Sequence, residues 1–403
     1  MTRLYLLIIL GISALLRTFR LGTPNELVFD EVYYVDGARD FLANGVELTD
    51  GKAEFVVHPP VGKWMIAIGM KFFGDDPFGW RISAALFGVA SIYLIFLAAR
   101  KLFNSDFLAL LSAALASIDG LHLVMSRTAL LDIFLMTFLL GAFVALLYQR
   151  YFLMALMLGL ALGTKWSALY FIIAIAIYLL VKERKALISY SIIIPSVYLI
   201  SWSGWFFSSN GWDRNSSSNS LSSLFNYHKE ILNFHTNLKV DHSYEASPWN
   251  WLILGRPTSF FYASPKTCGA DNCAQEILAM GTPPIWWVGL IAILVTIGYF
   301  IYRRDKSAGF ILLGLLSNYL PWLLFPERTT FYFYAIAFQP FLILAIAFAT
   351  KEFLKESENQ RRIWVLSGFS LSALVFLYFA PLYLGTVLTY DAWYSRMWFA
   401  SWI

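Results

Sequence analysis

A succession of long apolar segments is the strongest constraint on how this chain can fold. A helix needs about 20 mainly apolar residues to cross roughly 30 Å of hydrocarbon. Eleven stretches meet or approach this requirement, namely 3–21, 77–100, 106–124, 128–148, 151–163, 166–181, 186–206, 283–302, 307–325, 329–350 and 362–388. They predict an all-α polytopic membrane protein with about eleven transmembrane helices. The fifth and sixth stretches are short, so a single re-entrant hairpin there is an alternative.

The composition supports this fold class. Only 14% of the 403 residues are charged, whereas a soluble domain is roughly a quarter charged. Too few charges are present to cover a surface in water, which excludes an ordinary soluble enzyme and a disordered chain. The net charge of +4 does not indicate nucleic-acid binding, because most cations flank the apolar segments. We see no repeat and no separate soluble domain, and expect one membrane domain over 1–403.

The short connections between these segments differ sharply in positive charge, and cytoplasmic loops carry the excess of Lys and Arg. One set of loops holds Arg3, Arg100, Lys101, Arg150, Lys182, Arg184, Lys185, Arg303, Arg304, Lys306, Lys351, Lys355, Arg361 and Arg362. The opposite set holds only Arg127, Lys165 and Arg328. The pattern predicts a multi-pass protein of the cell membrane with a cytoplasmic N-terminus and an outer C-terminal tail, 389–403.

The first apolar segment has a second interpretation, since residues 4–16 also suit the core of a signal peptide. Arg17 and Arg20 follow directly, and no small-x-small cleavage site is present. We therefore expect a retained first helix.

Two loops on the predicted outer side, 22–76 and 206–282, are longer than ordinary connectors, and such loops are usually functional. The second contains Cys268 and Cys273, the only cysteines. On the oxidising side of a membrane we expect a disulfide between them, with two unpaired thiols as the alternative. The first loop contains His58-Pro59-Pro60 followed by a short apolar stretch to Phe73. It reads as a helix that begins at proline and lies in the outer interface.

The first outer loop also contains the adjacent carboxylates Asp30 and Glu31. Neighbours in sequence point in different directions, so they do not suit a glycosidase pair about 5 Å apart. We expect one carboxylate in a site and the other in support. The alternative is an acidic pair that only stabilises a helix N-terminus.

Further ionisable residues gather near the outer ends of the apolar segments. They are Arg81, Asp119, His122, Arg127, Asp132, Lys165, Glu327 and Arg328. Charges at membrane depth are costly and are functional candidates by default. We expect Arg127 to pair with Asp119 or Asp132. Arg81 and Lys165 have no acidic partner close in sequence, so we expect a phosphate site there, or else snorkelling anchors.

An ordered series of motifs on this side resembles the protein O-mannosyltransferases, specifically their shorter bacterial branch. It comprises Phe29-Asp30-Glu31-Val32-Tyr33-Tyr34, His58-Pro59-Pro60-Val61-Gly62-Lys63-Trp64, Pro77-Phe78-Gly79-Trp80-Arg81, Asp119-Gly120-Leu121-His122, Ser126-Arg127-Thr128-Ala129-Leu130-Leu131-Asp132, Gly163-Thr164-Lys165-Trp166, Ser247-Pro248-Trp249, Trp286-Trp287 and Arg328-Thr329-Thr330-Phe331. Asp-Glu alone is a weak signal, whereas the series runs in order through most of the chain.

The resemblance implies a GT-C-type membrane glycosyltransferase with about eleven spans. It implies inverting transfer of mannose from a polyprenyl-phosphate carrier to Ser or Thr of exported proteins. By the same resemblance Asp30 is the catalytic acidic residue, and Arg81 and Lys165 are partners of the carrier phosphate. Fungal and animal relatives insert a β-trefoil domain in the large outer loop, for which 206–282 is too short.

These expectations give each candidate residue a role. Asp30 is ionised at neutral pH and accepts the hydroxyl proton, while Glu31 holds Asp30 or a nearby cation. The remaining candidates are Arg81, Lys165, Arg127 and Arg328 for the donor phosphate, and His58, Lys63, Tyr33 and Trp166 for sugar or acceptor. His58 as a helix cap is the alternative. No cofactor and no obligatory metal ion are expected.

The expected partners are polyprenyl-phosphate-mannose, acceptor proteins met near the secretion translocon, and membrane lipid, with no nucleic acid. The nearest rival is a related enzyme that uses another lipid-linked sugar or a lipid or polysaccharide acceptor. A lipid-carrier transporter is a rival from another class. It would favour charges near the bilayer midplane and paired repeats, and neither is visible.

Overall fold

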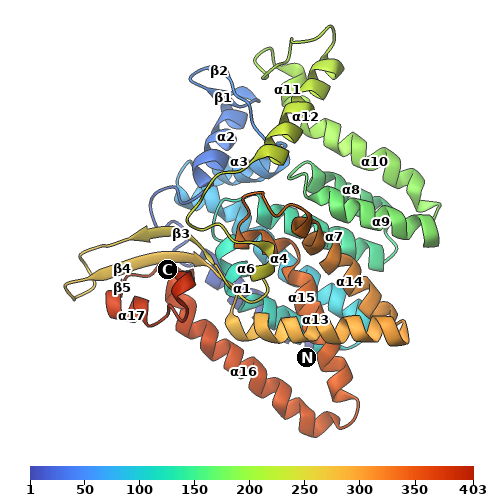
Figure 1. Ribbon diagram of the computed structural model, residues 1–403, viewed down its shortest axis with the longest axis vertical. Coiled ribbons are helices and arrows are strands. Elements are labelled where there is room, and N and C mark those ends of the chain that lie inside the picture. The colour runs from blue at the N-terminus through green and yellow to red at the C-terminus, as the bar shows by residue number, and fades with distance from the viewer.

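A computed structural model describes residues 1–403, apart from the side chain of Glu358. The chain is mainly helical, with short strands in the two long loops and near the C-terminus (Figure 1). The first half contains α1 (Thr2–Thr18), α2 (Glu31–Asn44), β1 (Leu48–Thr49), β2 (Lys52–Ala53), α3 (Val61–Phe73), α4 (Pro77–Phe103), α5 (Asp106–Ser117), α6 (Gly120–Met125), α7 (Asp132–Leu147), α8 (Tyr151–Leu162), α9 (Ala168–Lys182) and α10 (Ala186–Ser201).

The second half begins with the large loop predicted to lie on the outer side. Its elements are α11 (Ser203–Phe207), α12 (Ser220–Asn237), η1 (Pro248–Asn250), β3 (Thr258–Ala263), β4 (Cys273–Ala279), α13 (Pro283–Arg303), α14 (Lys306–Tyr319), η2 (Leu320–Leu324), η3 (Tyr332–Ala337), α15 (Gln339–Leu354), α16 (Glu358–Tyr383), β5 (Leu388–Thr389), α17 (Tyr390–Tyr394) and η4 (Ala400–Trp402).

The apolar helices make this an integral membrane protein. In the described part of the chain, four helices are long and apolar enough to span a bilayer, namely Pro77–Phe103, Pro283–Arg303, Lys306–Leu324 and Asn359–Tyr383. Shorter apolar helices cover Asp106–Ser117, Asp132–Leu147, Tyr151–Leu162, Ala168–Lys182 and Ala186–Ser201. The prediction of a polytopic helical membrane protein is confirmed, while the number of eleven spans stays a prediction.

Several predicted spans are interrupted, and each break has a local cause. The stretch 106–124 divides into α5 and α6, because the Asp119 carboxylate accepts a hydrogen bond from the His122 amide and starts a new helix. The stretch 329–350 begins as the 3₁₀ helix η3, and α15 starts only at Gln339-Pro340. Apolar composition alone does not reveal such breaks.

Helix α7 is the centre of the core. Every residue from Asp132 to Leu147 is buried, and α4 and α8 pack against it. Its first turn, with Asp132, faces the same region as the turn between α8 and α9. This arrangement brings the end of one predicted span to the beginning of another.

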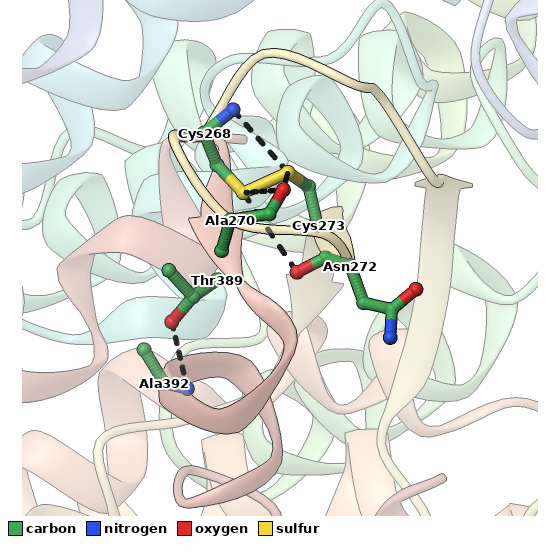
Figure 2. The surroundings of a disulfide bond; sticks show 6 residues. All are labelled: Cys268, Ala270, Asn272, Cys273, Thr389 and Ala392. Atoms are coloured by element: carbon green, nitrogen blue, oxygen red, sulfur yellow. Dashed lines mark hydrogen bonds between the residues drawn. A yellow bond between two sulfur atoms is a disulfide. The ribbon is translucent and has the colours of Figure 1, made fainter.

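The two long loops fold into compact additions beside the helices. In the first, α2 and α3 pack together and are joined by the β1–β2 hairpin (Figure 1). In the second, β3 and β4 form an antiparallel hairpin, and β5, from the C-terminal part of the chain, pairs with β4 to complete a sheet in the order β3-β4-β5. Cys268 and Cys273 form a disulfide at the tip of the β3–β4 hairpin, close to Thr389 of the C-terminal tail (Figure 2).

Candidate active site

Asp30 stands at the start of α2, and its position is fixed by the residue before it. Phe29 has a φ of 50°, an uncommon conformation for a residue with a side chain. Its ring stacks on Phe260 of β3 with a centroid distance of 4.6 Å and meets Phe331 and Phe333 edge-on. The aromatic contacts hold the turn, and Asp30 follows it half-buried.

Glu31 is fully buried and ties three parts of the chain together. Its carboxylate accepts hydrogen bonds from the amides of Val28 at 3.0 Å and Ala129 at 2.8 Å. It also accepts two from the Arg81 guanidinium, both at 2.8 Å. Bidentate pairing of this kind fixes geometry strongly. The expectation that Glu31 holds a nearby cation agrees with this arrangement.

Arg81 is not placed as the resemblance implied. It is 1% exposed, and besides Glu31 it donates to the carbonyls of Leu21, Pro24 and Glu26. Its N–H groups are occupied within the protein, so none points to a cavity that holds a phosphate. The partner, Glu31, lies 50 residues earlier, and local sequence therefore gave no sign of the pair. We reassign Arg81 as a positioning residue.

Arg127 is also occupied by backbone groups. Its guanidinium donates to the carbonyls of Leu16, Arg17, Phe19 and Arg20. These are orphan acceptors at the end of α1, which a cation there satisfies. The expected ion pair of Arg127 with Asp119 or Asp132 is wrong, and the geometry gives no support to a phosphate contact by Arg127.

Lys165 is paired with Asp132, which lies in the first turn of α7. The ammonium donates to both carboxylate oxygens, at 3.0 and 2.9 Å, and lies 4.9 Å from the centroid of the Tyr334 ring. Lys165 is close enough to Asp30 for its charge to act on that carboxylate. Asp30 and Lys165 therefore lie near each other, while their roles in catalysis and phosphate binding stay predictions.

Burial raises the pKa of Asp30 from its ordinary value to about 6, while the Lys165 charge opposes this and the Asp132 charge adds to it. The Tyr34 hydroxyl hydrogen-bonds the same carboxyl group and favours its ionised form. Asp30 is thus mostly ionised at pH 7 and a better proton acceptor than an ordinary carboxylate. A base with a pKa near the working pH is the favourable case for general-base catalysis.

A cavity of about 210 Å³ opens beside Asp132 and Lys165. It is lined by His58, Asp132, Leu135, Lys165, Trp166, Ser167, Leu169, Tyr170, Leu232, His235, Thr236, Asn318, Trp322, Phe325, Arg328, Tyr334 and Ala337. Its walls are largely aromatic, and its cations are Lys165 and Arg328. Pockets of this composition are typical binding sites. We call it the donor pocket.

Arg328 is the second cation of the donor pocket. Its Nε donates to the His235 carbonyl and its Nη1 to the Thr329 carbonyl, and the guanidinium lies 5.5 Å from the centre of the Trp322 ring. The side chain is half-buried. Within the described residues Nη2 makes no hydrogen bond, which leaves a charged donor for a ligand.

His58 enters the donor pocket in a neutral form. It stacks on His235 with centroids 5.4 Å apart, and burial, with Lys165 second, holds its pKa well below the usual range. Its buried Nδ1 has no hydrogen-bond partner in the described part of the chain. His58 is not a helix cap, because Pro60 occupies that position in α3. An unpaired imidazole nitrogen suits a sugar hydroxyl.

Of the remaining candidates, one lines the donor pocket and two do not. Trp166 lines the pocket, and its indole N–H donates to the Tyr198 hydroxyl at 2.9 Å. Lys63 is buried in an ion pair with Glu47, which joins α3 to the segment before β1. Tyr33 is 70% exposed. Neither Lys63 nor Tyr33 lines the pocket, so the structure gives no support to their expected binding roles.

Sequence reasoning missed several residues of the site, notably His235, Tyr334 and Trp322. They come from the large loop and the segments 320–337, far along the chain from Asp30. One signal was available, because His228 and His235 are seven residues apart on α12 and the chain has only five histidines. That spacing puts both on one face of a helix. Tyr334 and Trp322 gave no comparable signal, because 18% of the residues in the chain are aromatic.

The fold is similar to that of solved membrane enzymes. The S. cerevisiae protein O-mannosyltransferase Pmt1-Pmt2 complex, solved with its sugar donor, aligns with a TM-score of 0.83 at 15% identity, over 100% of this chain and 92% of that chain. ArnT from Cupriavidus metallidurans in the apo state aligns with a TM-score of 0.63 at 15% identity, over 94% of this chain and 76% of that chain. The chain therefore has a GT-C-like glycosyltransferase fold.

Sequence comparison narrows this class to one family. Residues 57–204 match the family model of dolichyl-phosphate-mannose-protein mannosyltransferases, and residues 220–402 match the C-terminal four TMM region of protein-O-mannosyltransferase. The polyprenol-phosphate-mannose–protein mannosyltransferase of Mycolicibacterium smegmatis is 31% identical over 98% of this chain and 92% of its own length. The chain belongs to the protein mannosyltransferase family and is a glycosyltransferase, which confirms the predicted resemblance.

Proposed function

We propose that this protein transfers mannose from polyprenyl-phosphate-mannose to Ser or Thr hydroxyls of exported proteins at the outer face of the cell membrane. The observation that carries the proposal is that Asp30 lies near Lys165 and Asp132, which line the donor pocket. A base and a cation on either side of a reacting carbon are what an inverting transfer from a phosphate carrier requires. The donor named for the M. smegmatis relative supports the choice of substrate.

The acceptor half of the reaction falls to Asp30. The hydroxyl oxygen of Ser or Thr attacks C1 of the mannose, and its proton passes to the Asp30 carboxylate as the new bond forms. The Tyr34 hydroxyl and the Lys165 charge favour the ionised form of the carboxylate. General-base catalysis of this kind contributes typically 10²–10⁴ in rate.

Lys165 and Arg328 act on the donor and stabilise its leaving phosphate. As the bond between C1 and the phosphate oxygen breaks, negative charge grows on the polyprenyl phosphate. Two cations at the wall of the pocket stabilise that charge, the electrostatic effect that is usually largest in catalysis. The phosphate is a weak base, so the leaving group needs no proton donor. His58 and His235, with the face of Trp166, are placed to contact the sugar.

Location and acceptors belong to the same proposal. The excess of Lys and Arg on one set of short loops supports a cytoplasmic N-terminus and a donor pocket on the outer face. Exported chains that emerge from a secretion translocon would meet the pocket there before they fold. No metal ion is needed in this scheme, because Lys165 and Arg328 supply the positive charge.

The test is an Asp30→Asn variant assayed with polyprenyl-phosphate-mannose and a Thr-containing peptide. We expect turnover to fall about 10²–10⁴-fold. Asp36→Asn, which changes an exposed carboxylate on the same helix, is the matched control and should retain near-normal activity. The melting temperature of Asp30→Asn should not fall, because the change removes a charge that burial disfavours. Near-normal turnover in a folded Asp30→Asn variant would contradict the proposal, as would preference for another lipid-linked sugar in a donor panel.

A further inference from the structure

A second cavity lies on the opposite side of α7 from the donor pocket. It has a volume of about 610 Å³ and runs between α4 and α8 with α7 as its floor. Tyr93 and Leu97 of α4 form one wall, Leu153 and Met157 of α8 form the other, and Gly141 and Ala145 lie on the floor. α4 and α8 each pack on α7. We call this cavity the α4–α8 groove.

One end of the groove carries uncompensated positive charge. Arg150, at the turn between α7 and α8, lines the groove together with Tyr148. The Lys101 ammonium lies 5.2 Å from the centroid of the same Tyr148 ring. In the described residues neither cation has a salt-bridge partner, and Asp106, the acid next to this end, is paired with Arg100 at 2.9 Å. This end of the groove therefore favours an anionic group, and the remainder of the groove favours an apolar ligand.

The floor of the groove admits a flexible chain better than a helix. Phe138 and Ala145 on the floor are only 6% and 3% exposed, so the space above them is narrow. Gly141 leaves the floor without a side chain at a point where both walls are close. A Cβ there would lie in ordinary contact with Met157 of α8 and Leu94 of α4, at 3.4 to 3.9 Å. A methylene chain reaches such a surface, whereas the side chains of a partner helix would be held away from it.

We propose that the α4–α8 groove binds an anionic glycerophospholipid, with its acyl chains along α7 and its phosphate between Lys101 and Arg150. Basic sites between membrane helices on the cytoplasmic side bind anionic headgroups in this way, and both cations belong to the loops with the Lys and Arg excess. The groove is separate from the donor pocket, which uses Asp132 and Leu135 at the other end of α7. The lipid would support the helix that carries Asp132.

The experiment is native mass spectrometry of the full chain in mild detergent, titrated with phosphatidylglycerol or with phosphatidylcholine of the same acyl chains. The wild type should bind phosphatidylglycerol more tightly. A Lys101→Ala/Arg150→Ala variant should bind it about 30-fold more weakly, from the usual weight of two cations near an anionic headgroup, and should lose the preference. Lys101→Arg/Arg150→Lys should keep the preference. Lys182→Ala/Lys185→Ala removes two exposed cations of another loop on the same side and should change binding less than twofold.

A second variant tests the apolar half independently of charge. Gly141→Leu fills the floor of the groove and should weaken the binding of both lipids about tenfold or more. Unchanged phosphatidylglycerol binding in the Lys101→Ala/Arg150→Ala variant would overturn the proposal. Tighter binding of undecaprenyl phosphate than of phosphatidylglycerol at the same site would do so too. A shift of Gly141→Leu from dimer to monomer with unchanged lipid binding would instead show that the groove is a contact between copies.

Discussion

At the scale of single residues, the structure separates groups that act on substrate from groups that hold them. Lys165 and Arg328 line the donor pocket and Asp30 lies near Lys165, and each has a charge that the proposed reaction uses. Glu31, Arg81 and Arg127 are charged as well, yet their hydrogen bonds are made to other groups inside the protein. Position relative to the donor pocket distinguishes the two sets, whereas residue type and burial do not, because Lys165 is 8% exposed and Arg127 is 7% exposed.

The pH dependence of catalysis follows from Asp30. Its pKa of about 6 means that the ionised, proton-accepting form is about 90% populated at pH 7 and only about 10% at pH 5. We therefore expect kcat/KM to fall about tenfold between pH 7 and pH 5, with the midpoint near pH 6. A pH–rate profile on reconstituted protein checks this. A flat profile between pH 5 and pH 8 would remove Asp30 as the base.

At the scale of elements, two arginines fix the connection that delivers Asp30. Arg127 holds the carbonyls at the end of α1, and Arg81 holds the carbonyls of Leu21, Pro24 and Glu26 further along. Glu31 then ties the start of α2 to the Ala129 amide ahead of α7. The path from α1 to α2 is thus held by Arg81 of α4 and by the connection between α6 and α7, which gives the carboxylate of Asp30 a rigid support.

Variants of the Glu31–Arg81 pair should act through this support. Because removal of one partner leaves the other buried and unpaired, we expect Glu31→Gln or Arg81→Ala to lower the free energy of unfolding by about 3–5 kcal/mol. The kcat should fall while donor affinity in the folded fraction stays near normal. Thermal unfolding and donor titration measure the two effects. A folded Arg81→Ala variant with normal kcat and weak donor binding would restore the phosphate role.

The limits of sequence reasoning also appear at this scale. Apolar length located the helical segments, because burial in lipid imposes a length on each. It overlooked the breaks at Asp119 and at Gln339-Pro340, where a single cap or proline decides the boundary. The motifs located Asp30, Lys165, Arg328, His58 and Trp166, but the ion pairs of Arg81 and Lys63 join distant segments. Such pairs follow from the packing of the helices, which local sequence does not encode.

At the scale of the whole molecule, the loops and the helices serve different parts of the proposed reaction. The long loops carry Asp30, His58 and His235, while Asp132 starts α7 and Lys165 lies in the turn between α8 and α9. The aromatic packing of Phe29 on Phe260 and Phe331 joins the first loop to the second and to the segment before α15. The site therefore exists only in the assembled chain.

Orientation is a prediction for the whole molecule. A Ser216→Cys variant places a thiol on an exposed position of the large loop, and Lys182→Cys places one at the far end of α9. Because the Lys and Arg excess puts the two on opposite sides, a membrane-impermeant maleimide should label Ser216→Cys in intact cells. Lys182→Cys should react only after permeabilisation. The reverse pattern would place the donor pocket on the cytoplasmic side.

The most direct measurement compares donor binding with single-turnover transfer in two variants, Asp30→Asn and Arg328→Ala. Asp30→Asn should bind polyprenyl-phosphate-mannose within a few-fold of the wild type and transfer the sugar about 10²-fold more slowly or worse. Arg328→Ala should bind the donor about 10- to 100-fold more weakly, from the loss of a charged hydrogen-bond donor. If Asp30→Asn abolished donor binding but transferred bound sugar normally, or if Arg328→Ala bound and transferred like the wild type, this division of roles would be contradicted.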